Sequence, residues 1–134
     1  LKDEYELKIQ QLEKEEIAHR IAAIERFEKF LAKYPRDPVF SPDAIFRLAE
    51  LYFEQSSDEY RAAQVKFDQD VAAYERGDLK IEPAPPETHY EKTIALYQRM
   101  ITEFSDHRLI DGALGDQFTG KVKSILENWS EEVL

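Results

Sequence analysis

The chain has 134 residues, of which 43% are hydrophobic and 12% aromatic, a composition typical of a folded domain rather than of a disordered segment. Its 28 acidic residues outnumber the 18 basic ones, and the net charge of −10 argues against binding to nucleic acid or to anionic membrane surfaces. The absence of cysteine excludes disulfides and thiolate metal ligands, and no apolar run approaches the roughly 18 residues of a membrane span.

A long helix is predicted from about residue 3 to residue 34. Its apolar residues recur at spacings of three to five, and the residues between them are mostly Glu, Lys, Gln and Arg, which favour helix. The apolar stripe consists of Ile9, Leu12, Ile17, Ile21, Ile24, Phe27, Leu31 and Tyr34. Pro35 predicts the end of this helix, because proline cannot continue the hydrogen-bond ladder.

A turn is expected over residues 35–41, where two prolines occur. Ser41 as N-cap, Pro42 at the first helical position and Asp43 in the first turn then predict the start of a second helix. This helix is expected to extend to about residue 55.

A third helix is predicted to begin at Ser56, because Ser56 and Glu59 have the spacing of a capping box. Gly77 is expected to end it. Residues 77–86 contain three prolines in four positions and predict an extended, stiff linker within the domain.

Three more helices are predicted after the linker. Thr88 with Glu91 is expected to cap a fourth helix that extends to about residue 104, followed by a fifth at residues 109–118 and a sixth at residues 122–133. No segment has the alternation of a strand. The sequence therefore predicts one all-α domain over residues 1–134 with about six helices.

Two of these helices share one template. Residues 23–35 align without a gap on residues 93–105, an offset of about twice the ~34-residue period of helix–turn–helix repeats. The aligned apolar pairs are Ile24 with Ile94, Phe27 with Tyr97, Phe30 with Met100, Leu31 with Ile101, and Tyr34 with Phe104. A repeated apolar template with variable polar positions is typical of a stacked scaffold.

The spacing resembles that of the tetratricopeptide repeat (TPR) superfamily. The second-helix template is matched by Ala23, Phe27, Phe30 and Pro35, and less fully by Thr93, Tyr97, Met100 and Ser105; the first-helix template is matched by Leu48-Ala49-x-x-Tyr52 and by Leu114-Gly115-x-x-Phe118. The resemblance implies antiparallel helical hairpins stacked as a short right-handed superhelix.

The longer first turn, with its Tyr-Pro-x-x-Pro pattern, is similar to that of bacterial cell-envelope repeat proteins, including outer-membrane assembly lipoproteins and the Tol–Pal-associated coordinator. This similarity favours the periplasm or cell envelope over the cytoplasm. The chain starts at Leu1 rather than at methionine, which indicates a processed product or an excised piece, and we expect it to be a fragment of a longer repeat protein.

In the repeat family, partners commonly lie in a concave groove lined by first helices. The groove positions carried over from the Leu48 match are Asp43, Phe46, Glu50, Phe53 and Glu54. The implied function is non-catalytic binding of a protein or peptide that has apolar anchors and basic residues. The alternative for Phe46 and Phe53 is burial against the first or fourth predicted helix.

Other readings are weaker. Gly115–Val122 is one residue short of a phosphate-binding loop and has Val122 where a magnesium-binding hydroxyl is required, which disfavours a nucleotide-binding enzyme fragment. The three histidines are isolated, so no metal, cofactor or catalytic site is predicted. The remaining alternative is a homo-oligomerising module that uses the long first helix, although its apolar stripe departs from a strict heptad.

Overall fold

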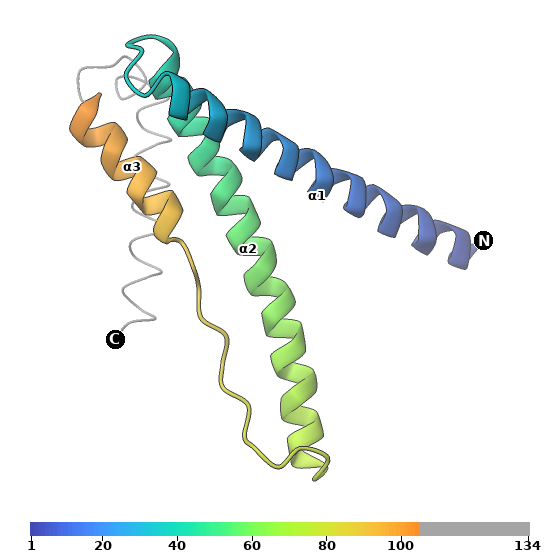
Figure 1. Cartoon of the computed structure of the whole chain (residues 1–134). Helices are drawn as coiled ribbons and strands as arrows, with labels where there is room; N and C mark the ends of the chain where they lie inside the picture. The colour runs from blue at the N-terminus through green and yellow to red at the C-terminus, as the bar shows by residue number, and fades with distance from the viewer. Residues whose placement is uncertain (105–134) are drawn as a thin grey trace.

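The computed structural model describes residues 1–104, which form three helices: α1 (Lys2–Lys33), α2 (Phe40–Glu75) and α3 (Glu91–Glu103). Figure 1 shows that α2 lies between α1 and α3. α1 and α2 meet at a short turn and diverge from it as the two arms of a V, while α3 packs antiparallel to the first part of α2. The described residues contain no strand, so the all-α prediction is confirmed for this part of the chain.

The predicted boundary at Ser56 is wrong, because α2 continues through it as one helix from Phe40 to Glu75. No proline or glycine occurs between residues 43 and 76, and Ser56 lies half-buried inside the helix. A capping box marks a helix start only where the preceding residues leave the helix, and nothing here forces them to. The first four predicted helices therefore correspond to three observed ones, and the fifth and sixth predicted helices lie outside the described residues.

The start of α2 also differs from the prediction. Ser41 is not the N-cap but lies in the first turn, where its hydroxyl accepts from the Asp37 N–H (2.8 Å) and donates to the Tyr34 carbonyl. The Asp37 carboxylate instead accepts from the N–H groups of Val39 and Phe40, both at 2.9 Å. These two backbone donors, Phe40 first, lower the pKa of Asp37. The turn is thus closed by two short side chains that satisfy free backbone groups.

The predicted linker is non-helical, as expected, and continues to the residue before α3. Gly77 has a φ of +86°, which reverses the chain after α2 and is a conformation that favours glycine. The linker then returns along α2 (Figure 1), with Pro83 and Pro86 half-buried. α3 begins at Glu91 rather than near Thr88, and the Tyr90 carbonyl accepts the first bond, from the Ile94 N–H.

The core lies near the closed end of the V. Its buried apolar residues are Ile24 and Leu31 of α1, Ala44, Ile45, Leu48 and Ala49 of α2, and Ile94, Tyr97 and Met100 of α3. The fully buried Thr93 hydroxyl donates to the Ala49 carbonyl at 3.5 Å, which places two small side chains at the contact between α2 and α3. One face of each helix therefore packs here.

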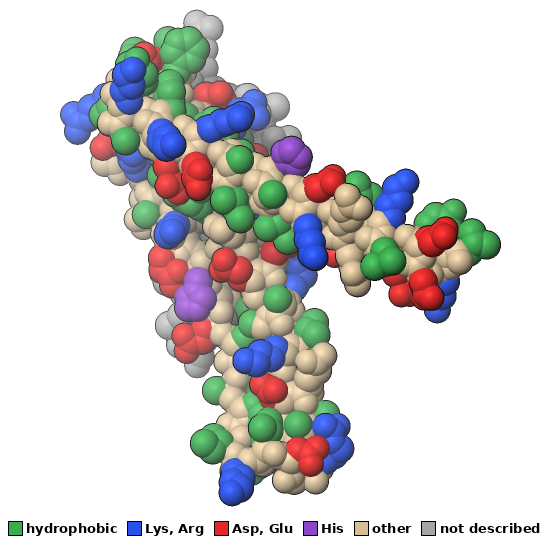
Figure 2. Space-filling model, turned by 45° about the vertical axis from the view of Figure 1, so that its right-hand side comes forward, with side chains coloured by type: hydrophobic (Ala, Val, Ile, Leu, Met, Phe, Trp, Pro, Cys, Tyr) green, Lys and Arg blue, Asp and Glu red, His purple; other side chains and the backbone are tan. Residues whose placement is uncertain are grey.

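The N-terminal half of α1 lies outside this core. Four apolar residues of its stripe, Ile9, Leu12, Ile17 and Ile21, are between 44% and 54% exposed. Figure 2 shows apolar and acidic side chains interspersed along this projecting arm. Of the stripe predicted for α1, only Ile24 and Leu31 are buried, Phe27 is half-buried, and Tyr34 at the end is 45% exposed.

Candidate protein-binding site

The predicted groove residues all lie on the first half of α2. Asp43 and Glu54 are exposed, and Glu50, Phe46 and Phe53 are half-buried. Asp43 forms an exposed ion pair with Arg47 (3.5 Å), a turn further along the same helix. The acidic members of the set therefore face solvent wholly or partly, as a binding face requires.

The two phenylalanines are less available than the acidic residues. Both pack against the core, and the Phe53 ring stacks on Tyr90, with ring centroids 5.2 Å apart and planes 24° apart. The Tyr90 hydroxyl lies 3.4 Å from the Ser57 hydroxyl, which holds this segment against α2. This geometry agrees with the alternative of partial burial against the helix that follows the linker, and that the five residues form a groove stays a prediction.

Tyr52 links all three helices. Its hydroxyl donates to the Glu28 carboxylate of α1 at 2.7 Å, and the Lys92 ammonium of α3 lies 5.3 Å from its ring centroid. Burial, followed by the hydrogen bond and negative charge of Glu28, raises the pKa of Tyr52 well above its usual value. The aromatic position of the Leu48-Ala49-x-x-Tyr52 template therefore holds the three helices together.

Tyr97 occupies the core between α2 and α3. Burial raises the pKa of Tyr97 to about 12, and the negative charge of Glu50 adds to the shift. Glu50 is therefore close enough to the core for its charge to act on Tyr97, whereas Asp43 and Glu54 are exposed to solvent.

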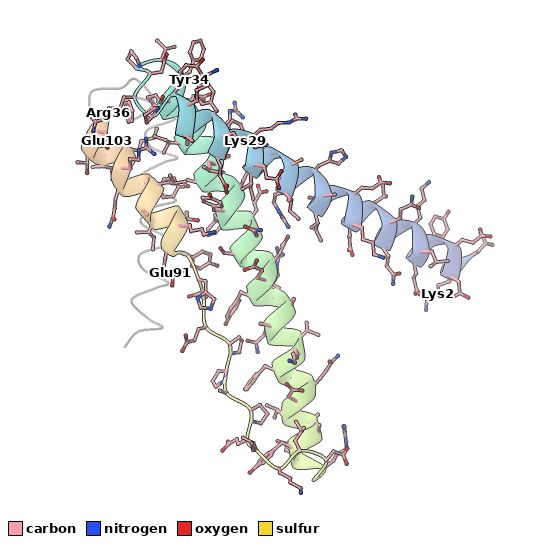
Figure 3. All side chains as sticks on the ribbon, in the orientation of Figure 1. Lys2, Lys29, Tyr34, Arg36, Glu91 and Glu103 are labelled. Atoms are coloured by element: carbon pink, nitrogen blue, oxygen red, sulfur yellow. The ribbon has the colours of Figure 1, made fainter. Side chains whose placement is uncertain are left out.

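Polar contacts close the narrow end of the V. Arg99 of α3 donates to the Pro35 carbonyl at 2.8 Å and pairs with Glu103 at 3.1 Å. Figure 3 shows Arg36 of the turn beside Glu103, and their charged groups are 4.0 Å apart. The turn that follows α1 is thus fastened to α3 as well as to α2.

One interaction that the sequence did not predict joins the two arms where they diverge. The Arg20 guanidinium pairs with the Asp58 carboxylate at 2.7 Å, and Arg61 pairs with the same carboxylate. Partial burial acts to raise the pKa of Asp58, but the hydrogen bonds and charges of the two arginines outweigh it and lower the pKa. The only possible sequence signal was opposite charge in two distant segments, which does not specify a contact.

The described residues contain no obvious site for other chemistry. Within residues 1–104, no three histidine or acidic side chains lie close enough together to hold a metal ion. None of the helices α1–α3 is both long enough and apolar enough to cross a bilayer. The near-match to a phosphate-binding loop at Gly115–Val122 falls outside the described residues.

Comparisons of the chain with protein-family models, with curated proteins and with solved structures find no match.

Proposed function

We propose that the chain is a TPR-like module of stacked helical hairpins that binds a protein or peptide and performs no catalysis. The observation that carries this proposal is the order of packing: α1 packs on α2 and α2 packs on α3, whereas α1 and α3 share few contacts. Stacking of each element on its neighbours in the chain is typical of helical repeats, which expose long surfaces to partners.

The repeated template supports the same proposal. Ile24 and Ile94 are both buried, and the aromatic pair Phe27 and Tyr97 both belong to the core or pack against it. The match is weaker at its outer edge, where Leu31 is buried but its counterpart Ile101 is 48% exposed. Equivalent positions of α1 and α3 thus mostly face α2. This arrangement is expected if α1 and α3 are each the second helix of a repeat and α2 is the first helix that lies between them.

The proposed binding face is the acidic side of α2 formed by Asp43, Glu50 and Glu54, together with the accessible edges of Phe46 and Phe53. Carboxylates beside aromatic edges suit a partner segment with basic residues around an apolar anchor. A role in a bacterial cell-envelope assembly is part of this proposal and depends on the resemblance of the long first turn.

The test is affinity capture from the source organism followed by mass spectrometry. Asp43→Lys with Glu54→Lys reverses two exposed charges of the face, and Glu15→Lys with Glu25→Lys makes the same change elsewhere, on α1. We expect the first variant to lose proteins that the wild type and the α1 variant retain. Identical capture by all three chains would refute the proposed face.

A second candidate is self-association through α1, which is favoured by the exposed apolar stripe of its N-terminal half. Such a stripe is commonly covered by another helix. Light scattering over a range of concentrations separates the two functions, because a monomer at all concentrations excludes self-association and leaves the partner-binding proposal in place.

A further inference from the structure

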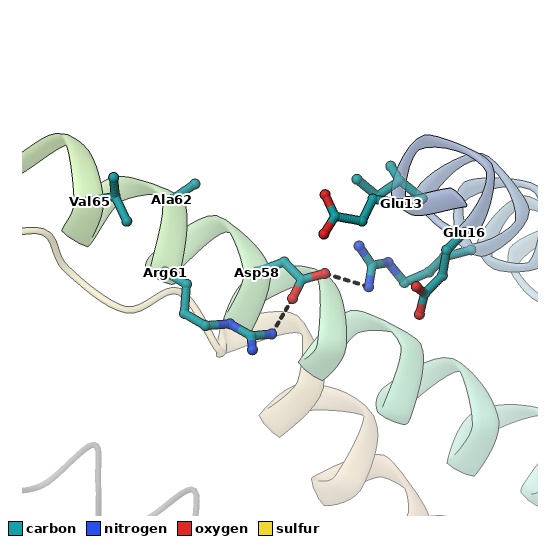
Figure 4. A pocket seen from close by; sticks show the side chains of 8 residues that line it. Glu13, Glu16, Asp58, Arg61, Ala62 and Val65 are labelled. Carbon is teal, nitrogen blue, oxygen red and sulfur yellow. Dashed lines mark hydrogen bonds and ion pairs between the residues drawn. The ribbon is translucent and has the colours of Figure 1, made fainter. Parts of the chain in front are cut away.

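The two arms of the V form a cleft whose lining includes none of the residues proposed for the acidic face of α2. Its volume is about 680 Å³. The lining residues are Glu13, Glu16, Ile17 and Arg20 from α1, and Asp58, Arg61, Ala62 and Val65 from α2. Figure 4 shows Glu13 and Glu16 on one wall, across from Asp58, Ala62 and Val65 on the other.

Apolar side chains line the cleft on both walls. Ile17 is 44% exposed on the α1 wall and Val65 is 57% exposed on the α2 wall. The inner end is closed by Arg20, whose side chain is only 11% exposed and is held by Asp58. The cleft therefore has a fixed inner end and two apolar walls on which a ligand can bury surface.

The charges that line the cleft do not balance. Asp58 is paired with both Arg20 and Arg61, which uses the two cations of the lining. Glu13 and Glu16 form no ion pair with any residue of the described part of the chain. The lining thus has three carboxylates against two guanidinium groups, and both arginines pair with Asp58, so Glu13 and Glu16 have no ion-paired cation of their own.

We propose that this cleft binds an amphipathic helix of another protein, with apolar side chains between the walls and lysine or arginine opposite Glu13 and Glu16. Two diverging helices form a groove that a third helix, ~10 Å across, can enter from the open end. The unmatched carboxylates specify the sign of the partner's charge.

A second copy of the chain fits this cleft poorly. Residues 2–16 of the α1 arm carry six acidic and three basic residues, a net charge of −3. Residues 58–75 of the α2 arm carry five acidic and two basic residues, again −3. Inserting either arm into the cleft of another copy would bring like charges together, which disfavours the pairing.

The proposal is tested by fluorescence anisotropy with a labelled synthetic helix of leucine and lysine at helical spacing. The comparison probe has glutamate in place of every lysine. With Glu13→Gln and Glu16→Gln combined, we expect the Kd of the lysine probe to rise about tenfold at low salt, the effect of two surface charge contacts. The matched control, Glu15→Gln with Glu25→Gln, removes the same charge outside the cleft and should change the Kd less than about twofold.

A second variant tests the apolar walls. Ile17→Gln with Val65→Gln removes two exposed apolar side chains, so the helical circular dichroism spectrum should persist while the Kd of the lysine probe rises about tenfold or more.

The site is located with a dye, because the chain has no cysteine of its own. An environment-sensitive dye on Ala62→Cys in the cleft should respond to the lysine probe. The same dye on Ala95→Cys, an exposed position of α3, should not respond.

Three results would overturn the proposal: equal weakening by the two glutamine pairs, equal binding of the glutamate probe, or a dimer in light scattering that Ile17→Gln with Val65→Gln dissociates. The last result would assign the cleft to a second copy. Failure of the α2 face is distinguishable with Asp43→Lys alone, because Asp43 lies about four helical turns from Asp58; this variant should leave binding in the cleft within about twofold of wild type.

Discussion

Truncating Ile45 should destabilise the fold far more than truncating Ile9, although both are helical isoleucines. Ile45 is fully buried in α2, whereas Ile9 on the α1 arm is 53% exposed. Replacing Ile45 by alanine removes three buried carbon atoms at ~0.8 kcal/mol each, and the cavity left behind increases the loss to about 3–4 kcal/mol.

The matched change at Ile9 should cost almost nothing. The side chain is half in water in the native state, and alanine is the better helix former, so the free energy of unfolding should change by less than about 0.5 kcal/mol. Urea unfolding followed by far-ultraviolet circular dichroism measures both variants against the wild type.

The core is small, so the alanine variant of Ile45 can leave too little folded protein to measure. Ile45→Val is the milder substitution, and it should lower the free energy of unfolding by about 1 kcal/mol without changing the m value of urea unfolding. Equal destabilisation by Ile45→Ala and Ile9→Ala would refute the assignment of the core to the closed end of the V, since it would require the α1 arm to be buried as well.

Other predictions concern the turn, the ion pair and the linker. Asp58→Asn should lower the free energy of unfolding by about 1 kcal/mol or less, because the Asp58 side chain is 39% exposed and its attraction to Arg20 is screened by solvent. Thermal melts should show a smaller loss at high salt. Both Asp58 and Asp37 have lowered pKa values in the folded chain, so their contribution is complete above the ordinary aspartate pKa of about 4 and is lost as pH falls through the folded values. The thermal unfolding midpoint, measured from pH 6 to pH 2 in steps of about one pH unit, should therefore fall in the wild type. It should fall less in Asp58→Asn. Gly77→Ala should lower the free energy of unfolding by about 1–2 kcal/mol through backbone strain alone, because φ is +86° and a Cβ would meet no atom within 4 Å. An unchanged unfolding midpoint would contradict the left-handed conformation of Gly77.

The sequence predicted best the helix ends that are marked by residues that break or disfavour a helix. α1 ends at Lys33, before Pro35, and α2 ends at Glu75, before Gly77, close to the predicted positions. The false boundary at Ser56 depended on a side-chain pattern alone. A capping residue permits a helix start but does not break a helix, whereas proline does.

The candidate site was predictable only in part. The Leu48-Ala49-x-x-Tyr52 match identified two buried residues of α2, Leu48 and Ala49, and placed the acidic residues on another side of the helix. It did not show that Phe53 would stack on Tyr90, because that contact depends on how the linker returns the chain to α2. The pairing of Arg20 with Asp58 was unpredictable for the same reason, since it depends on the angle between two helices.

The continuity of α2 limits how this chain can vary in length. A single inserted residue near Ser57 would rotate everything beyond it by ~100° about the helix axis and turn Ala62 and Val65 away from α1. Seven residues complete nearly two turns and leave an offset of only ~20°. Insertions or deletions at this point in homologues that keep both arms should therefore comprise whole heptads. The length of the proline-rich linker should change to match.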